Sequence, residues 1–152
     1  MSPDPVLHQR IADSFSAQSL MTTLGARLQS VREGEVRIVL PWAAHLSQQQ
    51  GFVHAGAISS VLDSACGYAA LTRAPAGCEV VTAEFKINLV RPAIGAHFVA
   101  IGRVQHAGQR LTVCSGEVLA CAVALDEATA QSPMKVVALM QATVVHVTVP
   151  PG

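Results

Sequence analysis

The feature that most constrains the fold is a segment from Ala57 to Thr72 that holds a single charged residue, Asp63. Nearly every other position is apolar or small, which predicts a helix enclosed by protein rather than one lying on a surface. A helix of this length spans about 24 Å. We therefore expect the remaining elements to wrap around one central helix, over residues 56–72.

The segments before this helix carry two different patterns. Apolar residues recur at spacings near three to five before Leu24, which predicts an N-terminal helical segment over residues 1–24. Apolar residues then alternate between Arg27 and Leu40 on either side of Glu33-Gly34, as in a hairpin of a half-buried sheet.

The segments after the helix are strand-like and separated by short turns. Their expected ranges are Val80 to Val90, His97 to His106, Leu111 to Leu125 and Lys135 to Val149. Long strands in series favour an antiparallel sheet. The fold class is therefore α+β, with one domain over residues 1–152.

Composition limits the partners. Hydrophobic residues make up 51% of the chain and charged residues 13%, so some apolar surface is expected to be buried against another copy. Basic and acidic residues cancel without any Lys or Arg run, which argues against nucleic acid and an anionic membrane as partners. No apolar stretch has the length of a signal peptide or a membrane span, and the cysteines form no C-x-x-C pair. We expect a cytoplasmic protein with reduced, inert thiols.

Asp63 needs a physical explanation, because an unpaired ionised carboxylate inside a protein costs several kcal/mol. It must be solvated in a cleft, hydrogen-bonded, or protonated with a raised pKa, and catalytic carboxylates occur in all three settings. The alternative is an aspartate that faces a solvent gap or bonds a loop amide.

The neighbours of Asp63 have a characteristic spacing. Gln48 lies six residues before His54, Asp63 lies nine residues after it, and Gly51 and Gly56 stand on either side of the histidine. This segment resembles the signature of hotdog-fold acyl-CoA thioesterases of the phenylacetate-degradation type, in which an Asn or Gln, a G-x-x-H-G-G turn and a helical Asp or Glu follow at these separations.

The similarity extends from about Gly25 to Val145, because residues 82–93 resemble the family's next strand, which runs from a Ser or Thr to a basic-Pro turn. It implies a hotdog fold, a sheet wrapped around one helix and paired edge to edge into a homodimer, and commonly a dimer of dimers. The active site would lie at the dimer interface and hydrolyse a small or medium acyl-CoA, aromatic or aliphatic, without a cofactor or a metal.

The resemblance also assigns roles. Asp63 from one subunit would act as nucleophile or as general base for a water, and the backbone N–H of Ala55, which together with Gly56 opens the helix of the other subunit, would bind the thioester oxygen. Gln48 would orient the water or the carbonyl, and the hydroxyl of Thr82 would assist.

Two residues depart from the family pattern. Ala55 stands where the pattern usually has Gly, and a positive φ there would cost about 1–2 kcal/mol. Gln48 replaces the commoner Asn.

Three further residues have expected roles outside the chemistry itself. His54 is expected to hold the turn by bonding loop backbone rather than to carry a proton. Arg91 and Arg110 are the expected partners of the CoA phosphates.

Two other functions remain open on the sequence. A hotdog hydratase or dehydratase would use His54 together with Asp63, so it would require the imidazole. A non-catalytic acyl-CoA-binding module would bind without releasing CoA. Serine hydrolase and nucleotide-binding classes are excluded, because no G-x-S-x-G, Walker loop or G-x-G-x-x-G is present.

Overall fold

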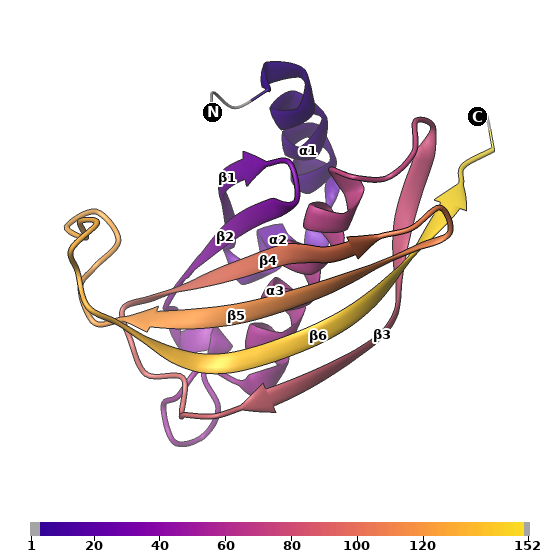
Figure 1. Cartoon of the computed structure of the whole chain (residues 1–152). Coiled ribbons are helices and arrows are strands. Elements are labelled where there is room, and N and C mark those ends of the chain that lie inside the picture. The colour runs from indigo at the N-terminus through magenta and orange to yellow at the C-terminus, as the bar shows by residue number, and fades with distance from the viewer. Residues whose placement is uncertain (1–3, 151–152) are drawn as a thin grey trace.

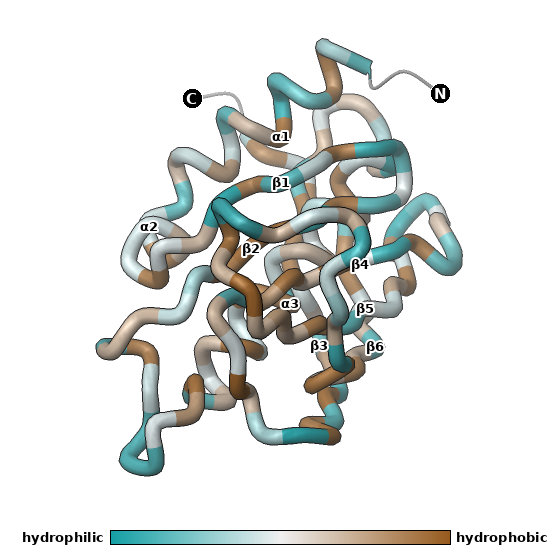
Figure 2. Tube along the Cα trace, turned by 90° about the vertical axis from the view of Figure 1, so that its left-hand side faces the viewer, coloured by the Kyte–Doolittle hydropathy of each residue, from teal (hydrophilic) through white to brown (hydrophobic). Residues whose placement is uncertain are grey.

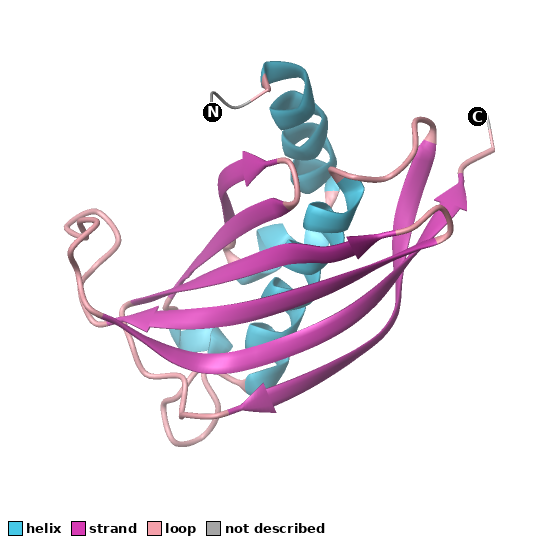
Figure 3. Cartoon of the chain, in the orientation of Figure 1, coloured by secondary structure: helices cyan, strands magenta, loops and turns pink. Residues whose placement is uncertain are grey.

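A six-stranded antiparallel sheet curves around one long helix, α3, and two N-terminal helices lie beside it (Figures 1 and 3). The structure is a computed structural model that describes residues 4–150, so residues 1–3 of the expected helical segment lie outside the described residues. The elements are α1 (Pro5–Ala17), α2 (Ser19–Leu24), β1 (Arg27–Arg32), β2 (Glu35–Pro41), the short 3-10 helix η1 (Ala44–Leu46), α3 (Ala55–Leu71), β3 (Cys78–Leu89), β4 (His97–Ala107), β5 (Leu111–Cys121) and β6 (Met134–Thr148).

The strand order is β1-β2-β4-β5-β6-β3, with every neighbouring pair antiparallel. The predicted α+β hotdog architecture is confirmed. β3 follows α3 in the chain but pairs with β6, the last strand, so one edge of the sheet is formed by β3. The other edge is β1, which joins β2 through the predicted turn at Glu33-Gly34.

The N-terminal helices begin and end at residues suited to those positions. The Asp4 carboxylate accepts a hydrogen bond from the Val6 N–H (2.9 Å), and Pro5 occupies the first helical position. The backbone becomes extended at Gln18, which ends α1, and α2 ends at Gly25 with φ of 76°.

Helix α3 crosses the concave face of the sheet, and Figure 2 shows its largely brown and pale tube among the strands. The two pack closely because Gly102 of β4 has no side chain: a Cβ there would overlap the backbone carbonyl of Ala65. The helix is less enclosed than its composition predicts. A stripe that includes Ser60, Asp63 and Gly67 is only partly covered, since this side faces the edge of the sheet where no further strand lies.

One predicted strand is too long. The strand expected from Leu111 to Leu125 ends at Cys121, and the chain then folds over the outer face of the sheet. There Leu125 packs on Val39, Val99 and Ile101, and the ring of the buried His97 bonds the Val123 carbonyl through Nδ1 (2.8 Å). These apolar residues cover a sheet face instead of extending a strand.

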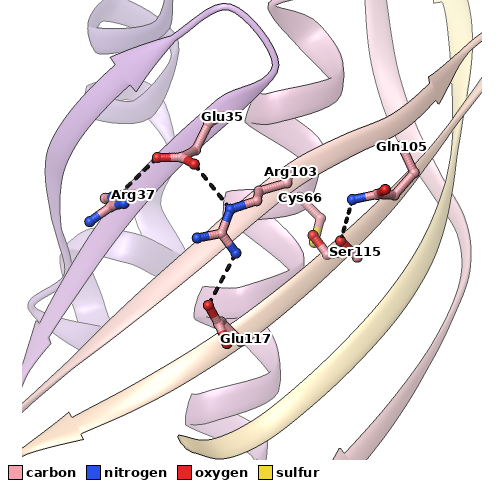
Figure 4. A network of polar contacts seen from close by, with 7 residues as sticks. All are labelled: Glu35, Arg37, Cys66, Arg103, Gln105, Ser115 and Glu117. Carbon is pink, nitrogen blue, oxygen red and sulfur yellow. Dashed lines mark hydrogen bonds and ion pairs between the residues drawn. The ribbon is translucent and has the colours of Figure 1, made fainter. Parts of the chain in front are cut away.

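The rest of the outer face carries a charge-balanced network (Figure 4). Glu35 pairs with Arg37 and Arg103, each at 3.0 Å, and Arg103 also pairs with Glu117 at 3.1 Å. Burial alone would raise the pKa of Glu35, but the hydrogen bonds from the two arginines outweigh it and hold that pKa below its ordinary value. Both acids of this network are therefore matched by cations.

Candidate active site

The N-terminus of α3 is closed by His54, which adopts an extended conformation with φ −60° and ψ 139°. Its Nδ1 accepts a hydrogen bond from the Gly56 N–H (2.7 Å), and its carbonyl accepts from Ala57 (3.0 Å) and Ile58 (3.3 Å). The histidine is therefore a helix cap, in agreement with its predicted structural role.

This capping leaves one backbone donor free. Among residues 4–150, the Ala55 N–H donates no hydrogen bond to the protein. That group is at the positive end of a 17-residue helix, where negative charge is favoured.

The alanine at position 55 causes no backbone strain. Every residue with positive φ in the described part of the chain is a glycine, so Ala55 has ordinary helical geometry. The glycine that the turn needs is Gly56, since a Cβ there would lie 3.0 Å from Nδ1 of His54. The geometry therefore accommodates the departure from the family pattern at Ala55.

A cavity of about 350 Å³ lies in front of this helix end, with Gln48, His54, Ala55 and Arg91 in its wall. The Gln48 side chain is folded back on its own turn: its Nε2 donates to Oε1 of Gln50 (3.2 Å), and its own Oε1 accepts from the Gln50 N–H. Arg91 donates to the Val136 carbonyl (2.7 Å). Gln48 therefore lies in the wall of this cavity, and both the oxygen and the nitrogen of its amide are bonded to Gln50.

Asp63 lies two turns further along α3 and faces β3. Its carboxylate accepts a hydrogen bond of 2.7 Å from the Thr82 hydroxyl, so the structure brings these two predicted residues together. Asp63 is half-buried, and it opens into a separate cavity of about 130 Å³. Of the three settings considered for this carboxylate, the structure shows a hydrogen bond and a position beside a cavity.

The walls of the Asp63 cavity include residues that sequence reasoning missed. Ser14 and Gln18 come from the end of α1, where Gln18 Oε1 accepts from the Ser64 hydroxyl (3.0 Å) and Ser14 lies 3.3 Å from the Tyr68 hydroxyl. Burial raises the pKa of Tyr68, so its hydroxyl stays protonated at neutral pH. The sequence gives no local signal for these contacts, because α1 and α3 meet only in the folded chain.

The two cavities do not form one site within a chain. Ala55 and Asp63 are eight residues apart on the same helix, or about 12 Å along its axis. No residue lines both cavities. A free N–H and a carboxylate this far apart cannot act on the same carbonyl group, so a site that used both would need two chains.

The two predicted CoA-binding arginines also lie apart. Arg91 bonds the start of β6 through Val136, whereas Arg110 lies in the β4–β5 turn, where its carbonyl accepts from His146 near the end of β6. Arg91 thus accompanies the Ala55 cavity. Arg110 lies toward the end of the sheet where Thr82 pairs with Val144.

The cysteine thiols do not line either cavity. All four cysteines are free; burial raises the pKa of the Cys66 thiol and brings that of Cys114 to about 12.

Within residues 4–150 no group of three or more His, Cys, Asp or Glu residues is placed to hold a metal ion. The helices of this same range are all too short or too polar to cross a membrane.

Comparisons with known proteins agree on the family of the fold. Residues 50–120 match the family model described as thioesterase superfamily. A thioesterase family protein from Silicibacter pomeroyi has a structure that is 37% identical, with a TM-score of 0.85, and the match covers 93% of this chain and 98% of that chain.

Two more distant proteins are also similar, one in fold and one in sequence. The Escherichia coli PaaI protein from the phenylacetic acid degradation operon is 21% identical and shares the fold, with a TM-score of 0.76 over 93% of both chains. A protein of Saccharolobus solfataricus named as an esterase is 29% identical over 111 residues, which are 72% of this chain and 77% of that protein.

Proposed function

The chain belongs to the thioesterase superfamily, and from that premise we propose that it hydrolyses a small or medium acyl-CoA to the free acid and CoA. The observation that carries this proposal is the Asp63 carboxylate, held at 2.7 Å by the Thr82 hydroxyl inside a cavity. The thioesterase relatives support the reaction class, and the free Ala55 N–H supplies the second group that thioester cleavage needs.

The chemistry follows from these two groups. Asp63 accepts a proton from a water molecule while the water oxygen attacks the thioester carbonyl carbon. Negative charge develops on the carbonyl oxygen, which the Ala55 N–H and the α3 dipole stabilise. The C–S bond then breaks, and the CoA sulfur leaves with the proton from Asp63. In the nucleophilic variant the carboxylate attacks the carbonyl carbon directly, and the C–S bond breaks to release CoA as the thiolate. Water then hydrolyses the resulting anhydride to the free acid and the Asp63 carboxylate, and the proton released in this step neutralises the thiolate.

His54 does not carry the proton in this scheme. Its Nδ1 already accepts the Gly56 N–H, so that nitrogen is occupied in holding the turn. This contact favours hydrolysis over the hydratase or dehydratase alternative, which would need the imidazole as an acid or base.

A second copy of the chain completes the site in this proposal. β3 is an edge strand with large exposed apolar residues, Val81, Phe85 and Leu89, and such an edge is usually covered. Antiparallel pairing of two β3 strands about Phe85 brings the Leu89 end of one strand, in the Ala55 cavity wall, toward the end of the other that carries Thr82, beyond the irregularity between Thr82 and Glu84. The two half-sites then face each other.

Charges on β3 support this register. Glu84 pairs with Thr143, and Lys86 pairs with Gln141 on β6, so both lie on the outer face of the sheet. Pairing about Phe85 sets Glu84 of each chain directly opposite Lys86 of the other. Arg110 of the second chain lies at the same end of its sheet as Thr82, the partner of Asp63. In the proposed dimer it therefore approaches the CoA phosphates from the side opposite Arg91.

Charge reversal tests the register. We expect Glu84→Lys to raise the dimer dissociation constant about tenfold, because two attractive pairs become repulsive. Lys86→Glu should do the same, and the double variant Glu84→Lys/Lys86→Glu should restore the wild-type constant. Sedimentation of a dilution series measures all four proteins. A double variant as weak as the single ones would show that these residues do not pair.

The proposed reaction is tested by thiol release from a panel of phenylacetyl, hydroxybenzoyl, short-chain, medium-chain and long-chain acyl-CoAs, followed with a disulfide chromogen. We expect the wild type to release CoA, and fastest from a short or aromatic acyl group, because the Asp63 cavity is only about 130 Å³. A folded protein that binds acyl-CoA and releases no CoA from any of them would be a binding module instead.

A further inference from the structure

A second groove continues the Ala55 cavity toward the start of β6. It has a volume of about 380 Å³, and Arg91, Pro92 and Val137 line both spaces. Its remaining walls are mainly apolar, with Ile94 and Pro133 among them. The two cavities therefore adjoin at these three residues, and we refer to them together as the channel.

Lys135 also lines this groove, and its sequence context did not indicate a functional role. In the sheet register Lys135 lies opposite Ala120 of β5, and residues directly opposite in an antiparallel pair point to the same face. Ala120 is buried against the core on the helix side. The Lys135 side chain therefore lies on the concave face, just beyond the N-terminus of α3.

The charged side chains that line this channel, Arg91 and Lys135, are both positive. No carboxylate belongs to the residues that line either cavity. Within the described residues 4–150, Lys135 forms no ion pair, in contrast to Arg37 and Arg103 on the outer face. Arg91 follows β3, and its guanidinium donates to the carbonyl of Val136, the residue after Lys135, so it reaches β6 beside the point where the Lys135 side chain starts.

From this arrangement we propose that Lys135 and Arg91 bind the phosphates of CoA, while the apolar walls between them and Ala55 contact the pantetheine arm. The inference rests on the proposed function and names Lys135 as a positioning residue of that site. One cation where the two cavities meet and a second one beyond it, both among mainly apolar walls, suit a ligand whose reacting thioester and phosphates are joined by an uncharged chain.

Calorimetric titration with free CoA and with pantetheine, which lacks the phosphates, tests this proposal on the wild type and Lys135→Gln. We expect Lys135→Gln to weaken CoA binding about tenfold and to leave pantetheine binding unchanged, since one charge-assisted contact is lost. The matched control is Arg27→Gln, which removes one charge from the exposed residue at the start of β1, on the opposite edge of the sheet, and should bind CoA as the wild type does.

The outcomes separate this proposal from the proposed function. Equal CoA affinity in the wild type and Lys135→Gln, or no CoA binding by the wild type, would overturn the assignment of Lys135. A tenfold loss in Lys135→Gln, in a protein that releases no CoA from any acyl-CoA, would retain Lys135 as a phosphate contact and reject hydrolysis.

Discussion

Replacing Asp63 with asparagine is expected to lower kcat for acyl-CoA hydrolysis by at least about a hundredfold, the scale of a catalytic carboxylate. Asparagine is nearly the same size and can still accept the hydrogen bond from Thr82, so the fold and the half-site geometry should be retained. What the variant loses is the basic oxygen that takes the proton from water or attacks the carbonyl. Thiol release, with circular dichroism of the same sample, measures the effect.

Glu79 provides the matched control, because it is the other carboxylate that lines the Asp63 cavity. Glu79→Gln should keep kcat within a few-fold of the wild type, since Glu79 lies on β3 and has no part in the hydrogen bond to Thr82. Equal losses in both variants would mean that the cavity needs negative charge in general. An active Asp63→Asn enzyme would remove Asp63 from the mechanism.

The second large effect is expected from Ala55→Pro, which deletes the one N–H proposed to bind the oxyanion. Removal of such a donor costs about 10²–10³ in kcat. Proline suits the first helical position, where the N–H makes no helical bond, and the ψ of 139° at His54 is one that a residue before proline adopts readily. Stability should therefore be unchanged or slightly increased, and thiol release together with urea unfolding checks both points.

Ala55→Gly is the companion variant, because it keeps the N–H and restores the residue usual in the family pattern. It should retain activity close to the wild type. If Ala55→Pro remained active with an intact fold, the oxyanion donor would have to be a different group. A loss in Ala55→Pro that came with weaker binding of free CoA would indicate that the ring blocks the channel.

The central helix and its carboxylate were predictable because both signals are local. A single charge in an apolar helix restricts the environments that Asp63 can occupy, and the spacing to His54 fixes where the helix begins. The alternation of apolar residues likewise predicted the hairpin before the helix and the four strands after it. Local patterns report which face of an element is buried, and that was enough for the fold.

The remaining features depend on contacts between distant segments. Residues 122–125 have a strand-like composition, yet Leu125 covers the outer face of the sheet, and composition does not distinguish the two uses of an apolar run. Ser14 reaches the Asp63 cavity only through the packing of α1 beside α3. Lys135 has no neighbouring motif, and its place in the groove follows from its pairing with Ala120.

If two chains share one active site, two inactive variants with defects in different halves of the site should complement each other. Asp63→Asn and Ala55→Pro are unfolded together in equal amounts, refolded, and assayed for thiol release. Half of the dimers should be mixed, each with one intact site of two, so the mixture should recover about a quarter of wild-type activity. If mass spectrometry detects mixed dimers while activity stays at the level of the separate variants, the half-sites do not combine across chains.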